Sequence, residues 1–115
     1  MSVEKAKANY MPKGAQKKMS CGQSVISAFK DKFSLDDSVI ASFAAYGGGK
    51  APGGVCGAYY AAQYILNLKN KDKAKECEDV LVSHAGSLKC KEIRQLKRLP
   101  CIGCVEKMAE ILEKL

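Results

Sequence analysis

The sequence predicts an all-α protein: a compact single-domain bundle of five or six helices, with a glycine-rich loop before a buried central helix. Helix-capping signals recur before apolar residues spaced three or four positions apart, and the alternation typical of strands is absent. A chain of 115 residues has room for one domain. Its composition, 47% hydrophobic and 27% charged, is that of an ordinary globular domain.

The first half of the chain is expected to form an arm and two helices. Residues 1–18 carry five lysines against one glutamate and are predicted to be a basic N-terminal arm, with residues 19–115 forming the domain. Ser20-Cys-Gly-Gln23 is a capping-box pattern that precedes the apolar face of a first helix. Ser34-Leu-Asp-Asp37 repeats the pattern before a second apolar stripe.

The second half is expected to form the glycine-rich loop and four helices. Residues 47–54 contain five glycines, and the stretch from Val55 to Leu68 that follows is apolar almost all round, as in a buried central helix. A fourth helix is predicted from Lys73 to Ala85, ended by Gly86. Ser87 is the predicted cap of a short fifth helix, and Pro100 fits the first turn of a sixth.

Six cysteines stand beside a single histidine. One histidine excludes a multi-histidine metal site, so that a dense metal centre here would need thiolate ligands. Cys21, Cys56, Cys90 and Cys101 each fall at the start of a predicted helix. Because a helix N-terminus carries about half a positive charge, it stabilises a thiolate and lowers the thiol pKa. This placement indicates redox or metal chemistry.

The glycines around Cys56 are candidate cofactor-binding residues. Gly53, Gly54 and Gly57 leave their backbone N–H groups unobstructed by side chains. A concave group of N–H donors suits anions, including the sulfur atoms of an iron–sulfur cluster.

The remaining cysteines and the histidine have other interpretations. Cys77 falls on an apolar helical stripe and is interpreted as a packing residue. His84 is interpreted as a helix C-terminal or surface residue. Cys101-Ile-Gly-Cys104 places two sulfurs on one helical face, where they can form a disulfide or give two metal ligands. No strand precedes this motif, which argues against a thioredoxin fold, and the other cysteines are too isolated for a zinc ribbon.

The order of the cysteines resembles a bacterial and archaeal family of redox-active proteins, the C_GCAxxG_C_C family. That family is defined by four cysteines in the order Cys … Cys-Gly-Ala-x-x-Gly … Cys … Cys. The resemblance includes the helix SCGQSVISAF, the loop GGGKAPGGVCGA, the segment GSLKC and the closing CIGCVEKMAEIL. It implies that the family's four cysteines are Cys21, Cys56, Cys90 and Cys101.

The chain departs from the family pattern in two ways. Ala61 stands where the motif has its closing glycine, and little effect on the fold is expected because alanine also allows close helix packing. Cys77 and Cys104 are additional cysteines. The resemblance makes Cys104 a possible resolving partner of Cys101, one that other members lack.

Two main functions follow from these observations. The first is thiol/disulfide chemistry, or electron transfer through a small iron–sulfur cluster held by Cys21, Cys56, Cys90 and Cys101, with an unidentified redox partner. The second is a non-enzymatic module whose cysteines bind zinc or form structural bridges. A third interpretation is a basic adaptor for a membrane transporter or a nucleic acid, with the cysteines merely buried; the transporter is suggested by the family, whose genes often lie near transporter genes. No hydrolase or nucleotide-binding motif is present, so that the sequence assigns no enzymatic reaction.

Charge and hydropathy exclude other classes. The net charge is +7, but the lysines are scattered without interleaved aromatic residues, so no nucleic-acid partner is expected. The uncharged stretch from Ala51 to Leu68 contains Pro52, and its apolar part is too short to cross a membrane. The N-terminal residues lack the apolar region of a secretory signal, and a cytoplasmic protein is expected.

Overall fold

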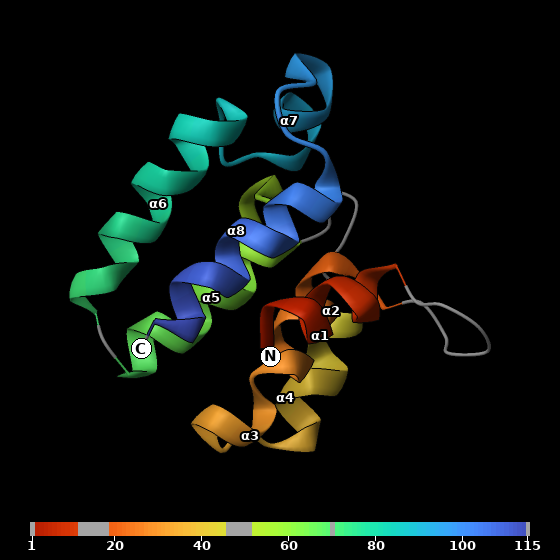
Figure 1. Ribbon diagram of the computed structural model, residues 1–115, viewed down its shortest axis with the longest axis vertical. Coiled ribbons are helices and arrows are strands. Elements are labelled where there is room, and N and C mark those ends of the chain that lie inside the picture. The colour runs from red at the N-terminus through yellow and green to blue at the C-terminus, as the bar shows by residue number, and fades with distance from the viewer. Residues whose placement is uncertain (1, 12–18, 46–51, 70, 115) are drawn as a thin grey trace.

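A computed structural model describes residues 2–11, 19–45, 52–69 and 71–114. This part of the chain forms eight α-helices and no strand, so the all-α prediction is confirmed (Figure 1). The helices are α1 (Ser2–Tyr10), α2 (Cys21–Ala28), α3 (Lys30–Phe33), α4 (Asp37–Ser42), α5 (Gly57–Lys69), α6 (Asp72–Ala85), α7 (Cys90–Leu96) and α8 (Cys101–Glu113). The predicted count of five or six was too low because it did not include the short helices α1 and α3.

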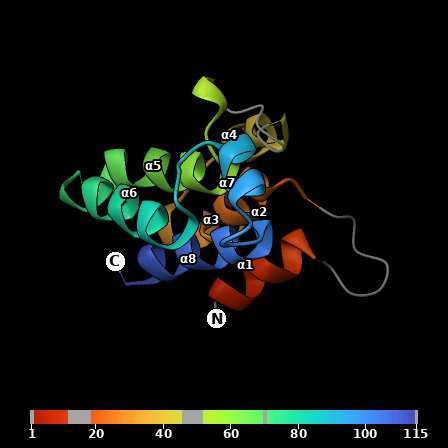
Figure 2. The same ribbon diagram turned by 90° about the horizontal axis from the view of Figure 1, so that it is seen from above.

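Helices α1, α2 and α6 pack around α5 and α8. Helix α8 contacts α1, α2, α5 and α6, and α5 contacts α2, α6 and α8. Figure 2 shows α1 beside α8, with α5 and α6 side by side across the molecule. The core is made of large apolar side chains that are fully buried: Ile26, Phe29, Ile65, Leu66, Leu81, Met108 and Leu112.

The predicted central helix is observed as α5, but only one of its faces is buried. Gly57, Ala58, Ala61, Ala62, Ile65 and Leu66 face the core. Tyr59, Tyr60 and Tyr64 are half-buried, and Leu68 is exposed. Tyrosine has a polar hydroxyl that favours contact with water, so an apolar composition did not require burial all round.

Helix α1 lies within the residues expected to form a basic arm. Ala6 is fully buried, and α1 packs against α2 and α8. Lys7 forms an ion pair with Glu106 at 2.9 Å, and the Asn9 side-chain amide donates to the carbonyl of Ser24 at 3.3 Å. Val3 and Tyr10 also pack against the core, so the lysine-rich composition concealed a packing face of a few residues spaced along α1.

Some of the predicted helix ends are confirmed and others are not. Gly86 ends α6 in the left-handed conformation with φ +87°, as predicted. Ser34, predicted to cap a helix, instead ends α3 with φ +53°, and α4 begins two residues later than that cap required. Ser87 lies two residues before the N-cap of α7, and its hydroxyl accepts the Lys89 N–H and donates to Glu92.

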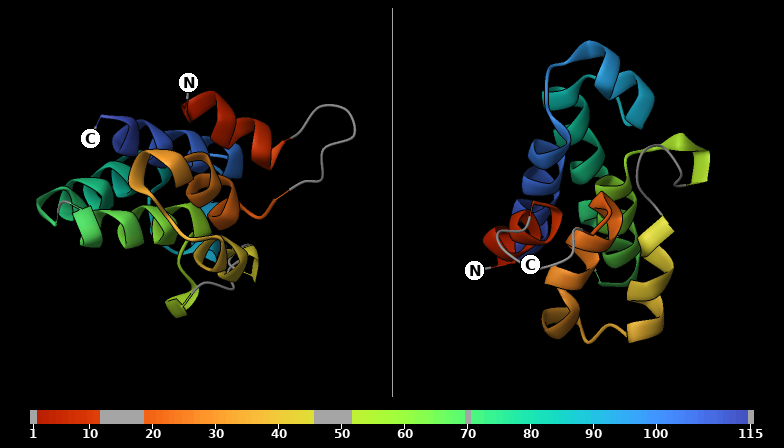
Figure 3. Two further views of the ribbon diagram at one scale, coloured as in Figure 1. Left: turned by 90° about the horizontal axis from the view of Figure 1, so that it is seen from below. Right: turned by 90° about the vertical axis from the view of Figure 1, so that its right-hand side faces the viewer.

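The overall arrangement places α3 and α7 at opposite ends of the molecule (Figure 3). Within the described ranges, none of the helices has both the length and the apolar character needed to cross a membrane.

Candidate functional site

Four cysteines lie where helices begin, as the sequence indicated. Cys21, Cys90 and Cys101 are the first residues of α2, α7 and α8. Cys56 immediately precedes Gly57, the first residue of α5. The side chains of two of them, Cys21 and Cys56, come together in the core; that of Cys101 lies outside the described part of the structure.

Cys21 is held in place by the cap of its helix. Ser20 is the N-cap of α2, and its hydroxyl oxygen accepts the N–H of Gln23 at 3.1 Å, as the capping-box pattern predicts. The same hydroxyl donates to the carbonyl of Phe43 at 2.9 Å. Ser20 therefore joins the start of α2 to the residue that directly follows α4.

Cys56 is held by the backbone of a distant segment. Its N–H donates to the carbonyl of Leu88 at 2.7 Å, and Val55 forms an isolated antiparallel bridge with Lys89. Gly53 and Gly54 precede this point with φ of +75° and +74°. A Cβ at either glycine would meet nothing within 4 Å, so it is the backbone conformation that favours glycine here.

The thiols of Cys21, Cys56 and Cys104 form a hydrogen-bonded row, here called the thiol row. Cys21 is hydrogen-bonded to Cys56, and Cys56 is hydrogen-bonded to Cys104. The three residues come from the starts of α2 and α5 and from the first turn of α8, and all are buried, with 7%, 5% and 1% of their surface exposed. Cys56 thus stands between two thiols that are far apart in the sequence.

The electrostatics of the thiol row differ from the prediction. The backbone N–H groups of Ala58 and Gly57, which belong to the start of α5 rather than to Cys21's own helix, lower the pKa of Cys21, but its hydrogen bond to Cys56 and its burial outweigh them and raise it. The hydrogen bond to Cys104 raises the pKa of Cys56 to about 12, with a smaller contribution from burial, while the hydrogen bond to Cys21 acts in the opposite direction. The predicted fall in pKa was therefore wrong for these two thiols, which are protonated at neutral pH.

Cys77 lies apart from the thiol row. It is fully buried, and its Sγ lies 3.2 Å from the Sδ of Met108. Burial raises its pKa to about 12, although a hydrogen bond from Gln63 acts in the opposite direction. These surroundings are those of a small apolar core residue.

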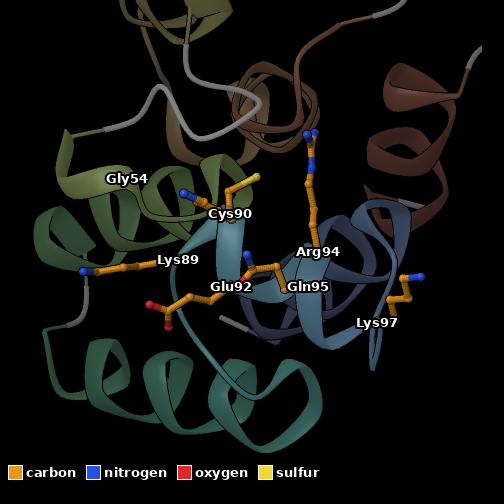
Figure 4. Close-up of a pocket in the computed structure, with 8 residues that line it drawn as sticks. Gly54, Lys89, Cys90, Glu92, Arg94, Gln95 and Lys97 are labelled. Atoms are coloured by element: carbon orange, nitrogen blue, oxygen red, sulfur yellow. The ribbon is translucent and has the colours of Figure 1, made fainter.

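Cys90 is buried at the edge of an open pocket at the end of the molecule where α7 lies. Figure 4 shows Cys90 and Arg94 projecting from α7 toward the same side, while Glu92 points to the other. The pocket has a volume of about 860 Å³, and four of the residues that line it are basic: Lys89, Lys91, Arg94 and Lys97. Sequence reasoning recorded these residues only as a scattered positive charge.

A metal site is not formed by the side chains that the structure describes. No group of three or more histidine, cysteine, aspartate or glutamate side chains among them has a geometry that could hold a metal ion. His84 is exposed, and its Nδ1 lies 2.9 Å from the carbonyl of Val80 in the same helix.

The position of Cys104 is the feature that sequence reasoning missed. It was interpreted as a partner of Cys101, three residues away, whereas the structure brings it to Cys56. The signal was its helical spacing: Cys104 falls four residues before Met108 on the buried stripe of α8, so its sulfur faces the core.

Comparison with known proteins gives one match. The model of the family described as "Putative redox-active protein (C_GCAxxG_C_C)" matches residues 19–115. Searches of the curated proteins and of the solved structures found no match.

Proposed function

Because the chain belongs to the C_GCAxxG_C_C family of redox-active proteins, we propose that the thiol row carries out reversible thiol–disulfide chemistry with Cys56 as the shared thiol. The observation that supports this most directly is the contact of Cys56 with both Cys21 and Cys104. Cysteines buried only as small apolar residues need not meet one another, as Cys77 illustrates by its contact with Met108.

In the proposed reaction the thiols of Cys21 and Cys56 become one disulfide. Their two S–H bonds break and one S–S bond forms, while two electrons and two protons pass to an external disulfide, which is reduced to two thiols. The Cys104 thiolate can then attack the Cys56 sulfur of the new bond and release Cys21 as a thiol. The disulfide thereby moves from Cys21–Cys56 to Cys56–Cys104 without a further electron acceptor.

Burial supports an order for the two disulfides. Cys21 and Cys56 retain a small exposed surface, whereas Cys104 has almost none. An external disulfide therefore meets Cys21 or Cys56 before Cys104. Cys104 is the internal resolving thiol in this proposal, and it acts on Cys56 in addition to any disulfide it forms with Cys101.

The test maps disulfides in the full chain. Protein purified without oxygen is fully reduced, equilibrated with a series of thiol–disulfide buffers, alkylated and digested, and the linked peptides are identified by mass spectrometry. We expect Cys21–Cys56 and Cys56–Cys104 linkages in the wild-type chain. Cys21→Ala should leave only the second of these linkages and Cys104→Ala only the first.

The control and the contrary results are equally definite. Cys77→Ala removes a buried cysteine outside the thiol row, and its linkage pattern should match that of the wild type. Linkages that exclude Cys56, or a chain that keeps all its thiols across the buffers, contradict the proposal. Iron and sulfide in equal amounts, in the ratio to the purified chain that a 2Fe–2S or 4Fe–4S cluster requires, would favour the iron–sulfur chemistry expected from the sequence instead.

A further inference from the structure

The pocket beside α7 combines a thiol with a surplus of positive charge. Lys89, Lys91, Arg94 and Lys97 line it together with one acidic residue, Glu92. The carboxylate of Glu92 is already hydrogen-bonded to the hydroxyl of Ser87 at 2.7 Å. Figure 4 shows the Glu92 side chain directed away from Cys90 and Arg94, so Arg94 is the labelled charged side chain on the Cys90 side of α7.

The lysines of this pocket are not neutralised by the acidic residues that the structure describes. The ion pairs found in the described ranges include none of Lys89, Lys91 and Lys97. All three are exposed. Unneutralised basic side chains around a concavity raise the local concentration of anions and the rate at which they arrive.

The size of the pocket and the burial of the thiol restrict what can reach it. A volume of about 860 Å³ is within the range of small-molecule sites. Cys90 is only 6% exposed, so a disulfide must be slender to bring its sulfur within bonding distance. A small molecule meets this requirement more readily than the disulfide of a folded protein.

From these observations we propose that the α7 pocket binds a low-molecular-weight disulfide that carries carboxylates, and that Cys90 forms a mixed disulfide with it. The Cys90 thiol loses its proton to water and its sulfur attacks one sulfur of the bound disulfide. One Cys90–S bond forms, the ligand's S–S bond breaks, and the departing thiolate takes up a proton to leave as a thiol. The lysines and Arg94 hold the carboxylates.

The pocket also has a direct backbone connection to the thiol row. Gly54, which lines the pocket, lies two residues before Cys56, and the Cys56 N–H is bonded to Leu88, two residues before Cys90. The inference supplies a chemical class of oxidant for the proposed thiol chemistry and in that respect rests on it. The product at Cys90 is nevertheless separate from the Cys56 linkages.

The experiment compares two disulfides of opposite charge on the reduced full chain at low ionic strength. Glutathione disulfide supplies an anionic probe and cystamine a cationic one, and peptide mapping measures the rate of mixed-disulfide formation at Cys90. We expect the anionic probe to react at Cys90 on the order of tenfold faster, with the difference shrinking as salt is added. Equal rates for the two probes overturn the inference.

Matched charge reversals localise the effect. Lys89→Glu with Lys91→Glu should slow the anionic probe at Cys90 on the order of tenfold. Lys69→Glu with Lys71→Glu makes the same change of charge on exposed residues at the far end of α5 and α6, and it should leave the rate nearly unchanged. Equal losses of rate in both variants would indicate a general effect of net charge and would refute the proposed binding at the pocket.

The outcomes separate this inference from the proposed function. Linkages at Cys56 without an anion-selective adduct at Cys90 leave the thiol row standing and refute the pocket. An anion-selective adduct at Cys90 without linkages at Cys56 supports ligand binding at the pocket and refutes the proposed chemistry of the thiol row.

Discussion

Three local influences act on the sulfur of Cys56. It touches a thiol on either side, it is buried, and it stands directly before a helix of 13 residues. The Cys21 hydrogen bond and the Tyr59 N–H in that helix favour the thiolate, but the Cys104 contact and burial favour the thiol, and together they prevail. The same residue is therefore a poor nucleophile until a neighbouring group or a disulfide changes its surroundings.

This balance predicts the pH dependence of Cys56 alkylation in the reduced chain. A pKa of about 12 means that the thiolate fraction, and with it the reaction rate, should rise about tenfold per pH unit from pH 7 to pH 10 without levelling off. Iodoacetamide labelling followed by peptide mass measures it. The chain unfolded in urea is the control, and its rate should level off near pH 9; a plateau at pH 7 to 8 in the folded chain would refute the raised pKa.

At the same scale, the site was only partly readable from the sequence. The starts of α2 and α5 could be located from a capping box and a glycine cluster, because both signals are local. That Cys104 meets Cys56, in addition to the signature residue Cys21, depends on how α8 is rotated against α5. The rotation of α8 is set by many side chains in the core and cannot be predicted from any single residue.

The element that orients Cys21 is the short helix α2. Its first turn is fixed by Ser20, which binds the Gln23 N–H within the helix and the Phe43 carbonyl outside it. A helix of eight residues has little intrinsic stability, so caps and packing decide whether it forms. Cys21 follows Ser20 directly, and its place in the thiol row depends on this cap.

Ser20→Ala should therefore lower the free energy of unfolding by about 1–2 kcal/mol, because it leaves the Gln23 N–H and the Phe43 carbonyl without this partner. Urea denaturation of the reduced chain measures the change. Ser38→Ala, at an exposed position in α4, is the matched control and should change the stability by less than about 0.5 kcal/mol. If the two variants were equally stable, the cap would have no structural role.

The longer helices were easier to predict than the short ones. Gly86 gives α6 an unambiguous end because its left-handed φ suits glycine, and the apolar spacing of α8 extends over 13 residues. Between Phe29 and Phe43 the chain instead makes two helices of four and six residues. Helices so short have few apolar positions with which to define a face, and Ser34 was misinterpreted for that reason.

On the scale of the whole molecule, the thiol row connects helices from the beginning, middle and end of the described chain. Cys21 and Cys56 are 35 positions apart, so a disulfide between them closes a long loop. In the chain-entropy account such a loop destabilises the unfolded state by about 4 kcal/mol. Oxidation should accordingly stabilise the fold.

We expect the oxidised chain to have the higher free energy of unfolding, by up to about 4 kcal/mol, in urea denaturation without reductant compared with denaturation in dithiothreitol. Cys77→Ala should retain the difference, since it leaves both linkages of the thiol row intact. Cys56→Ala should remove the part due to those linkages. Identical denaturation midpoints for the two redox states of the wild type would show that no such disulfide forms.

The contact between Cys21 and Cys56 therefore ties folding to redox potential through a thermodynamic cycle. In this cycle, the free energy by which the disulfide stabilises the fold equals the free energy by which folding stabilises the disulfide. About 4 kcal/mol corresponds to about 85 mV for a two-electron couple, so we expect the midpoint potential of the folded chain to lie below that of its unfolded form by about that amount. Folding itself would then make this dithiol the stronger electron donor.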